Sequence, residues 1–205
     1  MYVNTSSPWW PTAGDPLKYL EPFLRAQPYV SDVRRWQGER VDYNLDRFRE
    51  FFETRHPPLF LNLAALQLQT FGLDPNLKDQ AWLRADCEPG CAEFDLVVNR
   101  VARWQSPFFN WRVFLARHAR RPVFVGLPAE HRAFSERFGE IHYVPTPTLL
   151  DVARLIASVG RFAGSQSCAY VIAEGMKVEV TLESSPDVPN GLFFREGRQS
   201  FSVYP

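Results

Sequence analysis

The stretch Arg161-Phe-Ala-Gly-Ser-Gln-Ser-Cys-Ala-Tyr-Val-Ile-Ala-Glu-Gly175 decides the fold. Its apolar opening predicts a strand that ends at Gly164, and the run from Ser167 to Met176 predicts a helix that follows after a tight polar turn. The unpaired N–H groups of such a first helical turn converge where a phosphate binds. The alternative is that Ser167 only caps the helix and that Gly164 only avoids a steric clash.

The same alternation of strand and helix extends outward from this stretch. Strands are expected at 94–99, 122–127, 140–144, 161–164 and 178–182, and helices at 108–118, 129–138, 148–158 and 167–176. Thr148 and Asp151 are spaced as a capping box, and Gly160 is placed to end that helix. Because crossovers between parallel strands are right-handed, the pattern predicts an α/β fold with a Rossmann-like, doubly wound parallel sheet. A ligand is then expected at the carboxyl ends of the strands.

The first half of the chain is less regular. Helices are expected at 16–25, with Asp15 as the cap, and at 45–53, with a short extended segment at 29–34 between them. A mostly buried helix is expected at 59–71, ended by Gly72. We therefore expect residues 1–90 to form a smaller, incomplete N-terminal lobe and residues 91–205 to form the Rossmann-like domain.

Composition narrows the classes of partner. The chain has 205 residues, and its 23 Lys and Arg residues balance 23 Asp and Glu residues. No overall field therefore recruits nucleic acid or an acidic membrane, and any anion site must be local. The apolar runs are shorter than the roughly 20 residues that cross a bilayer. With no transmembrane segment and no signal peptide expected, the prediction is a cytoplasmic protein.

Cysteine usage indicates neither a disulfide framework nor a metal site. The chain has three cysteines, and Cys87 and Cys91 form the one close pair. Their C-x3-C spacing has no second pair and no nearby histidine, which zinc sites normally supply. No bound metal and no cofactor are expected.

Two arginines follow the first strand of the second half. Arg100 and Arg103 come directly after an apolar run, at a strand end where ligands bind in such sheets. A guanidinium group matches phosphate oxygens in geometry and charge, which suits a diphosphate. The alternative is that both are surface residues, paired with Glu93 or Asp95.

Further candidates follow the other strands. Gly126 permits close approach of a ligand to the backbone, and Glu130 and His131 lie in the first turn of the next helix, where a carboxylate also serves as a cap. His131 is the best placed of the four histidines to act as a general base, and it is a weak catalytic candidate. Glu174 lies about two turns beyond Ser167 and could accept hydrogen bonds from a ribose, or it could be a solvated helix residue. The polar turn at 183–190 could border the site or be a plain surface loop.

Several common fingerprints are absent from the sequence. Neither G-x-x-x-x-G-K-[ST] nor G-x-G-x-x-G occurs, which argues against the familiar ATP and NAD enzymes. The G-x-S-x-G elbow of hydrolases is also missing, because the segment that begins at Gly164 lacks the second glycine.

The order of these motifs resembles the C-terminal domain of glycosyltransferases related to the lipopolysaccharide heptosyltransferases. The likeness is carried by Val98-Asn-Arg100, Phe124-Val-Gly126 with Glu130-His131, Phe162-Ala-Gly-Ser-Gln-Ser167 and Ile172-Ala-Glu-Gly175. Segments 20–33, 41–46 and 48–49 resemble the tail of the N-terminal domain in bacterial and phage-encoded relatives. Each motif alone is weak, and their order carries the resemblance.

The resemblance implies a GT-B fold and a metal-independent glycosyltransferase. Such an enzyme moves a sugar from a nucleoside diphosphate sugar to an acceptor, here a carbohydrate or glycolipid. By position, the resemblance assigns the donor diphosphate to Arg100, Arg103, Gly164, Ser165, Gln166 and Ser167, and the nucleoside and ribose to Gly126, Glu130 and Glu174.

Two departures from the family keep other functions open. The family's N-terminal domain opens with a strand and a Gly-Asp loop that supplies the catalytic carboxylate, and this chain is expected to begin after that unit. The Asp-x-Gly-x-x-His pattern of the diphosphate loop is replaced by Gly164-Ser-Gln-Ser167. The first alternative is therefore a catalytically inactive nucleotide-sugar-binding or structural protein. The second is an unrelated α/β enzyme such as an epimerase or a phosphosugar enzyme.

Overall fold

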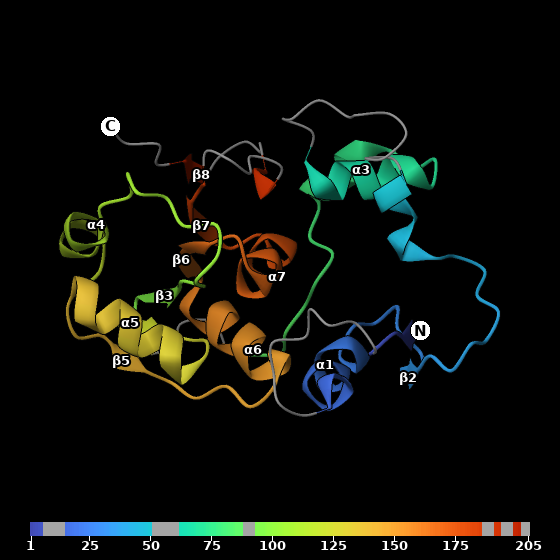
Figure 1. The fold of residues 1–205 in the computed structure, drawn as a ribbon, viewed down its shortest axis with the longest axis horizontal. Coiled ribbons are helices and arrows are strands. Elements are labelled where there is room, and N and C mark those ends of the chain that lie inside the picture. Colours follow the sequence, from blue (N-terminus) through green and yellow to red (C-terminus); the bar gives the residue numbers. More distant parts are fainter. Residues whose placement is uncertain (6–14, 51–61, 88–92, 186–190, 194–198, 202–205) are drawn as a thin grey trace.

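The computed structural model describes residues 1–5, 15–50, 62–87, 93–185, 191–193 and 199–201 (Figure 1). Its centre is a parallel sheet of six strands in the order β5-β4-β3-β6-β7-β8. The strands are β3 Leu96–Asn99, β4 Pro122–Phe124, β5 His142–Tyr143, β6 Arg161–Ser165, β7 Glu179–Glu183 and β8 Gln199–Phe201. The predicted Rossmann-like, doubly wound α/β fold is confirmed.

The strands are all parallel, but the side on which the chain adds new strands to the sheet changes between β3 and β6. The chain proceeds from β3 through β4 to β5, then returns past β3 and continues through β6, β7 and β8 on the other side. The register pairs Asn99 with Gly164 and Ser165 with Glu183. In doubly wound sheets this reversal opens a crevice outside the carboxyl ends of the two central strands.

Helices cover both faces of the sheet (Figure 1). They are α4 Trp111–His118, α5 Pro128–Phe138, α6 Leu149–Val159 and α7 Cys168–Met176. Because side chains alternate along a strand, Leu96 and Val98 enter one core with α4 and α5. Val97 enters the other core with α6 and α7. The sheet is therefore buried on both sides, as a parallel sheet requires.

The ends of α6 follow the predicted capping chemistry. The Thr148 hydroxyl accepts a hydrogen bond from the Asp151 N–H, and the Asp151 carboxylate accepts one from the Thr148 N–H. Gly160 ends the helix in the left-handed region, with φ of 72°. Both predictions are confirmed. The helix expected at 108–118 begins later, at Trp111, because Asn110 takes the cap position and accepts from the Val113 N–H.

The N-terminal half contains short elements. These are β1 Tyr2–Val3, α1 Pro16–Arg25, β2 Arg34–Arg35, the 3₁₀ turns η1 Leu45–Arg47 and η2 Pro75–Asp79, and α3 Leu63–Thr70. The predicted α1 and its Asp15 cap are confirmed. Of the helix expected at 45–53, η1 forms the start, residues 48–50 continue as α-helix, and residues 51–53 lie outside the described residues. Gly72 follows α3 as predicted, but within α3 only Ala65 and Leu66 are buried, so the helix is less buried than expected.

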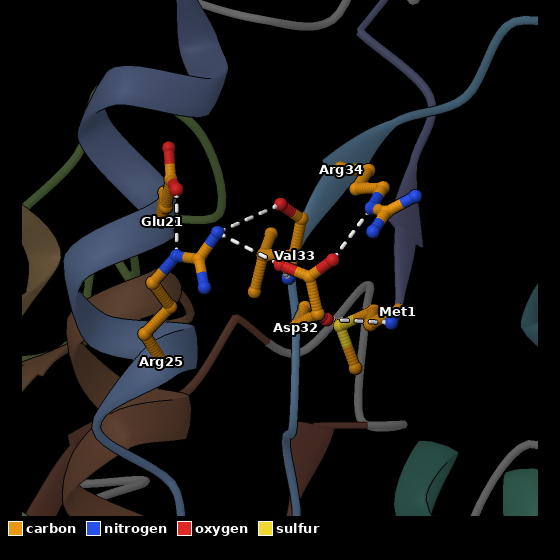
Figure 2. A network of polar contacts seen from close by, with 6 residues as sticks. All are labelled: Met1, Glu21, Arg25, Asp32, Val33 and Arg34. Carbon is orange, nitrogen blue, oxygen red and sulfur yellow. Dashed lines mark hydrogen bonds and ion pairs between the residues drawn. The ribbon is translucent and has the colours of Figure 1, made fainter.

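A polar network joins α1 to the segment that leads into β2 (Figure 2). The Arg25 Nε donates to Glu21 Oε1 at 2.7 Å, and its Nη2 donates to Asp32 Oδ1 at 2.9 Å. The other oxygen of Asp32 pairs with Arg34, and the Met1 amino group donates to the Asp32 carbonyl. These side chains are largely exposed, so the network orders the segment more than it stabilises the fold.

The N-terminal elements share a core with the sheet. α1 packs against α6, and Phe23 of α1 is buried in the same cluster as Val97 and Ile156. Trp82 and Leu83 also pack on this cluster. The division at residue 90 stays a prediction, and the described residues on either side of it contribute to one apolar interior.

Candidate functional site

The loops after β3 and β6 meet at the carboxyl edge of the sheet. The Val101 N–H donates a hydrogen bond of 3.0 Å to the Ser165 hydroxyl, and Ser165 is fully buried. The strand ends are also close at Gly164, where a Cβ would lie 2.4 Å from the Asn99 carbonyl oxygen. The glycine is therefore required by the close approach of β3 and β6, which supports the steric alternative at that position.

The start of α7 lies beside this junction. The Ser167 hydroxyl caps the helix by accepting a hydrogen bond from the Tyr170 N–H at 3.2 Å. The N–H groups of Cys168 and Ala169 occupy helix positions that have no acceptor within the helix itself. Gln166 faces the segment at Gly191, since a Cβ there would lie 2.4 Å from Gln166 Nε2. The N-terminus of α7 thus lies at the carboxyl edge of the sheet, directly after β6.

Arg100 is committed to an ion pair. Its Nε and Nη2 donate to the two carboxylate oxygens of Glu183 at 2.8 and 2.9 Å, and its guanidinium lies 5.1 Å from the centroid of the Phe138 ring. The residue is 8% exposed, so the surface alternative is wrong for Arg100. Glu93 instead pairs with the Arg121 side chain, and Asp95 accepts from backbone N–H groups.

Glu183 is the centre of this cluster; the sequence places it in the polar turn at 183–190 but does not predict its pairing with Arg100. Besides Arg100, its oxygens accept from the Ser106 N–H at 3.0 Å and from the Trp111 indole N–H at 3.0 Å. The expectation of a plain surface loop after β7 is wrong for Glu183, Ser184 and Ser185, which are buried. The missed signal was an acidic residue at the end of an apolar strand, because such a carboxylate needs a buried partner.

Arg103 has a different environment. It is exposed, and its charge acts on Cys168 at the start of α7. Desolvation raises the pKa of the Cys168 thiol, and the Arg103 charge opposes that rise. Of the two arginines predicted to bind phosphate, Arg103 is the exposed one, and its charge acts at the first residue of α7.

Gly126, Asn99 and Glu130 converge beyond the end of β4. Gly126 has φ of 136°, and a Cβ there would lie 2.8 Å from both Asn99 Nδ2 and Glu130 Oε2. Glu130 Oε2 accepts from the Leu127 N–H at 3.0 Å, which is the capping role considered from the sequence. Desolvation raises the pKa of the Glu130 carboxyl, and the hydrogen bond from Leu127 opposes that rise.

A tyrosine from α1 completes this edge. Desolvation raises the pKa of the Tyr19 phenol, and Cys168, Glu130, Asp151 and Tyr143 raise it further through their negative charge. Tyr19 packs on the core cluster that contains Val152 of α6 and Ala169 of α7. Nothing in its local sequence distinguishes it from an ordinary residue of an amphipathic helix.

His131 is held by structural contacts. Its Nε2 lies 2.9 Å from the Ile141 carbonyl oxygen and 3.2 Å from the Ser135 hydroxyl. The ring stacks on Tyr143 at 4.9 Å between centroids. Donation to the carbonyl oxygen explains the ring's orientation, and its catalytic role stays a prediction.

Glu174 lies away from the crevice. It is fully buried, with Lys177 Nζ 3.7 Å from its carboxylate, so the expectation of a solvated residue is wrong. The ammonium group of Lys177 also lies 4.2 Å from the centroid of the Trp82 ring. Seven residues of helix place Glu174 about 10 Å along the axis from Ser167. We therefore leave Glu174 out of the proposed site.

Among the residues that the structure describes, no three His, Cys, Asp or Glu side chains gather closely enough to hold a metal ion. Cys87 forms no disulfide within the described residues, and Cys91 lies outside them. No helix in the described parts of the chain is long and apolar enough to span a membrane.

Fold and site together define a Rossmann-like α/β protein with a candidate ligand crevice at the reversal of strand order. No family model matches the chain, and no curated protein matches it. A search of solved structures finds a similarity to the dodecameric iron-containing heptosyltransferase TibC, determined in complex with ADP-D-beta-D-heptose. The two are 16% identical with a TM-score of 0.47, and the match covers 72% of this chain and 41% of that one. The chain thus matches less than half of that enzyme's length.

Proposed function

We propose that the chain binds a nucleoside diphosphate sugar in the crevice between β3 and β6, as part of a glycosyltransferase. The observation that carries the proposal is the hydrogen bond between the Val101 N–H and the Ser165 hydroxyl, at the reversal of strand order. It supports a single ligand site shared by both loops. The order of sequence motifs supplies the glycosyltransferase class.

In this proposal the diphosphate lies at the start of α7. The backbone N–H groups after Ser167 and the exposed charge of Arg103 favour an anion there. Ser165 and Gln166 border the same turn. Arg100 would contribute through its positive charge, because two of its nitrogens already donate to Glu183.

The nucleoside lies on the β4 side of the crevice. Gly126 would approach it through its backbone, since any larger residue at this position would meet Asn99 and Glu130. Glu130 is half-buried at the first turn of α5 and would accept hydrogen bonds from a ribose. The crevice therefore has an anion-binding side and a hydroxyl-binding side.

Binding without turnover is the second candidate function, and the contacts of His131 favour it. The Nε2 atom of His131 is engaged by the Ile141 carbonyl and the Ser135 hydroxyl, which reduces its availability as a base. Release of free sugar or sugar transfer from a bound donor would support the enzyme. Tight donor binding without either reaction would support a binding protein.

A thermal-shift screen against UDP, GDP, ADP, CMP and their sugar conjugates tests the proposal. A ligand at a hundred times its dissociation constant adds about 2.7 kcal/mol to the free energy of unfolding, which raises the melting temperature measurably. Arg103→Ala should weaken binding by about 1.5–3 kcal/mol, the range for charge-assisted hydrogen bonds. Arg117→Ala is the matched control, because this exposed residue lies in the last turn of α4. If no nucleotide raises the melting temperature, the proposed function fails.

A further inference from the structure

Asn99, the last residue of β3, has an unmatched hydrogen-bonding atom. Its side chain is 4% exposed, and its Nδ2 donates to the Val125 carbonyl at 2.8 Å. This bond fixes the orientation of the amide, since the flipped amide would place two oxygens face to face. The remaining atom, Asn99 Oδ1, has no hydrogen-bond partner among the described residues.

A buried acceptor without a donor is uncommon in folded proteins and costs free energy. Asn99 pairs across the sheet with Gly164, so it lies at the reversal of strand order where a ligand is expected. The amide nitrogen serves the Val125 carbonyl, so structural contacts account for one end of the side chain and leave Oδ1 without a role. A ligand that donates a hydrogen bond to Asn99 Oδ1 would satisfy this acceptor and give the amide oxygen a role in binding.

We propose that Asn99 is a specificity-determining residue whose Oδ1 accepts a hydrogen bond from a hydroxyl group of the bound ligand. The inference rests on the proposed function and deepens it by naming the chemistry of one subsite. A phosphate cannot occupy this subsite, because its oxygens and Oδ1 are both acceptors at neutral pH. The ligand group is a sugar or ribose hydroxyl.

The neighbours of Asn99 fit such a subsite. Glu130 Oε2 lies beside the amide at Gly126, and a carboxylate oxygen also attracts hydroxyl donors. Asn99 Oδ1 has almost no exposed surface in this conformation, so a ligand hydroxyl reaches it when a neighbouring side chain is displaced. Glu130 is partly exposed and lies near the Nδ2 end of the same amide, at Gly126. The ligand is thereby oriented, with its anion at α7 and its hydroxyl groups at Asn99.

Calorimetric titration with matched probes tests this orientation. The probes are pyrophosphate, the nucleoside diphosphate with the largest thermal shift, its sugar conjugate, and 2′-deoxy and 3′-deoxy forms of that nucleotide. Asn99→Leu, which is close in size, should lower affinity for the hydroxyl-bearing probe at least tenfold and leave pyrophosphate affinity unchanged. Arg103→Ala, the matched variant, should weaken pyrophosphate binding.

The ligand is varied as well, so that the test stands even if Asn99→Leu does not fold. Removing the contacted hydroxyl from the ligand should weaken its binding to the unaltered protein at least tenfold. The deoxy ligand and Asn99→Leu combined should lower the affinity no more than either change alone, because both remove the same hydrogen bond. If affinity falls with a probe that lacks a ribose hydroxyl, the contact is at the ribose. If Asn99→Leu lowers affinity only for the sugar conjugate, the contact is at the transferred sugar.

The outcomes separate this inference from the proposed function. If nucleotides bind but neither Asn99→Leu nor any deoxy probe weakens them, the Asn99 subsite is wrong and nucleotide binding stands. Saturation-transfer NMR with ribose, glucose and mannose covers the case in which no nucleotide binds. Sugar binding that depends on Asn99 then supports the subsite and overturns the nucleotide site, and its absence overturns both.

Discussion

Glu183 shows how much one buried carboxylate organises at the edge of the sheet. It is fully buried, and its oxygens accept four hydrogen bonds, two from Arg100, one from the Ser106 N–H and one from the indole of Trp111 at the start of α4. Arg100 lies 83 residues away in sequence, so no local pattern predicts the pair. The arginine was recognised from the sequence as important, but its partner was not.

Removal of this carboxylate should destabilise the protein strongly. Glu183→Ala leaves the Arg100 guanidinium buried and unpaired, which costs about 3–5 kcal/mol. Urea unfolding measures the loss. Glu179→Gln is the control on the same strand, where the partly exposed pair with Arg161 should contribute under about 1 kcal/mol. Equal effects of the two substitutions would contradict the assignment.

Glu130 should make stability depend on pH. Its folded-state pKa is raised above the ordinary 4.5 by desolvation, so the folded protein binds the proton more tightly than the unfolded chain does. Stability from this group is therefore present below pH 4.5 and is lost as pH rises through the folded pKa. Glu130→Gln should remove that loss, as measured by thermal unfolding from pH 4 to 8. Glu136→Gln, an exposed change on the same helix, should leave the profile unaltered.

At the scale of single elements, capping residues were the most reliable sequence signals. The Thr148 and Asp151 box, the Asp15 cap and the stop at Gly160 are all present. Strand ends were less predictable. The expected strand at 122–127 is assigned only over Pro122–Phe124, and its last bond to β3 comes from the Val125 N–H, because apolar character continues beyond the ladder of hydrogen bonds. The strand β8 was missed entirely, and it adds a sixth member to the sheet.

Loss of the α6 cap should have a moderate effect. Thr148→Ala removes the acceptor of the Asp151 N–H, and the free energy of unfolding should fall by about 1 kcal/mol. The same substitution at Thr146, two residues before the cap, serves as the control in a chemical denaturation series. An unchanged midpoint for Thr148→Ala would show that the cap does not limit the stability of α6.

At the scale of the whole molecule, the sequence predicted the parallel sheet because strands and helices alternate with short connections. It could not predict where α1 packs, since that depends on contacts between residues more than a hundred positions apart. Phe23 of α1 joins Ile156 and Val97 in one core, and Tyr19 of the same helix reaches the edge where the candidate site lies. The N-terminal residues therefore contribute to the site's surroundings.

This shared core predicts cooperative unfolding across residue 90. Phe23→Ala should destabilise the sheet as well as α1, by about 3–5 kcal/mol, because it leaves a cavity in the common interior. Circular dichroism and tryptophan fluorescence should report one coincident transition. Leu45→Ala, at a residue that is 60% exposed, is the control and should change stability little. Two separate transitions would indicate that the N-terminal lobe folds independently.

The central claim is that one crevice, at the reversal between β3 and β6, binds a nucleoside diphosphate sugar. Amide NMR titration of the isotope-labelled protein with the best nucleotide from the screen tests it most directly. Binding in this crevice should shift the amide signals of residues 99–103, 126–130 and 164–169, at the carboxyl edge of the sheet. Shifts gathered elsewhere, or none at saturating nucleotide, would contradict it.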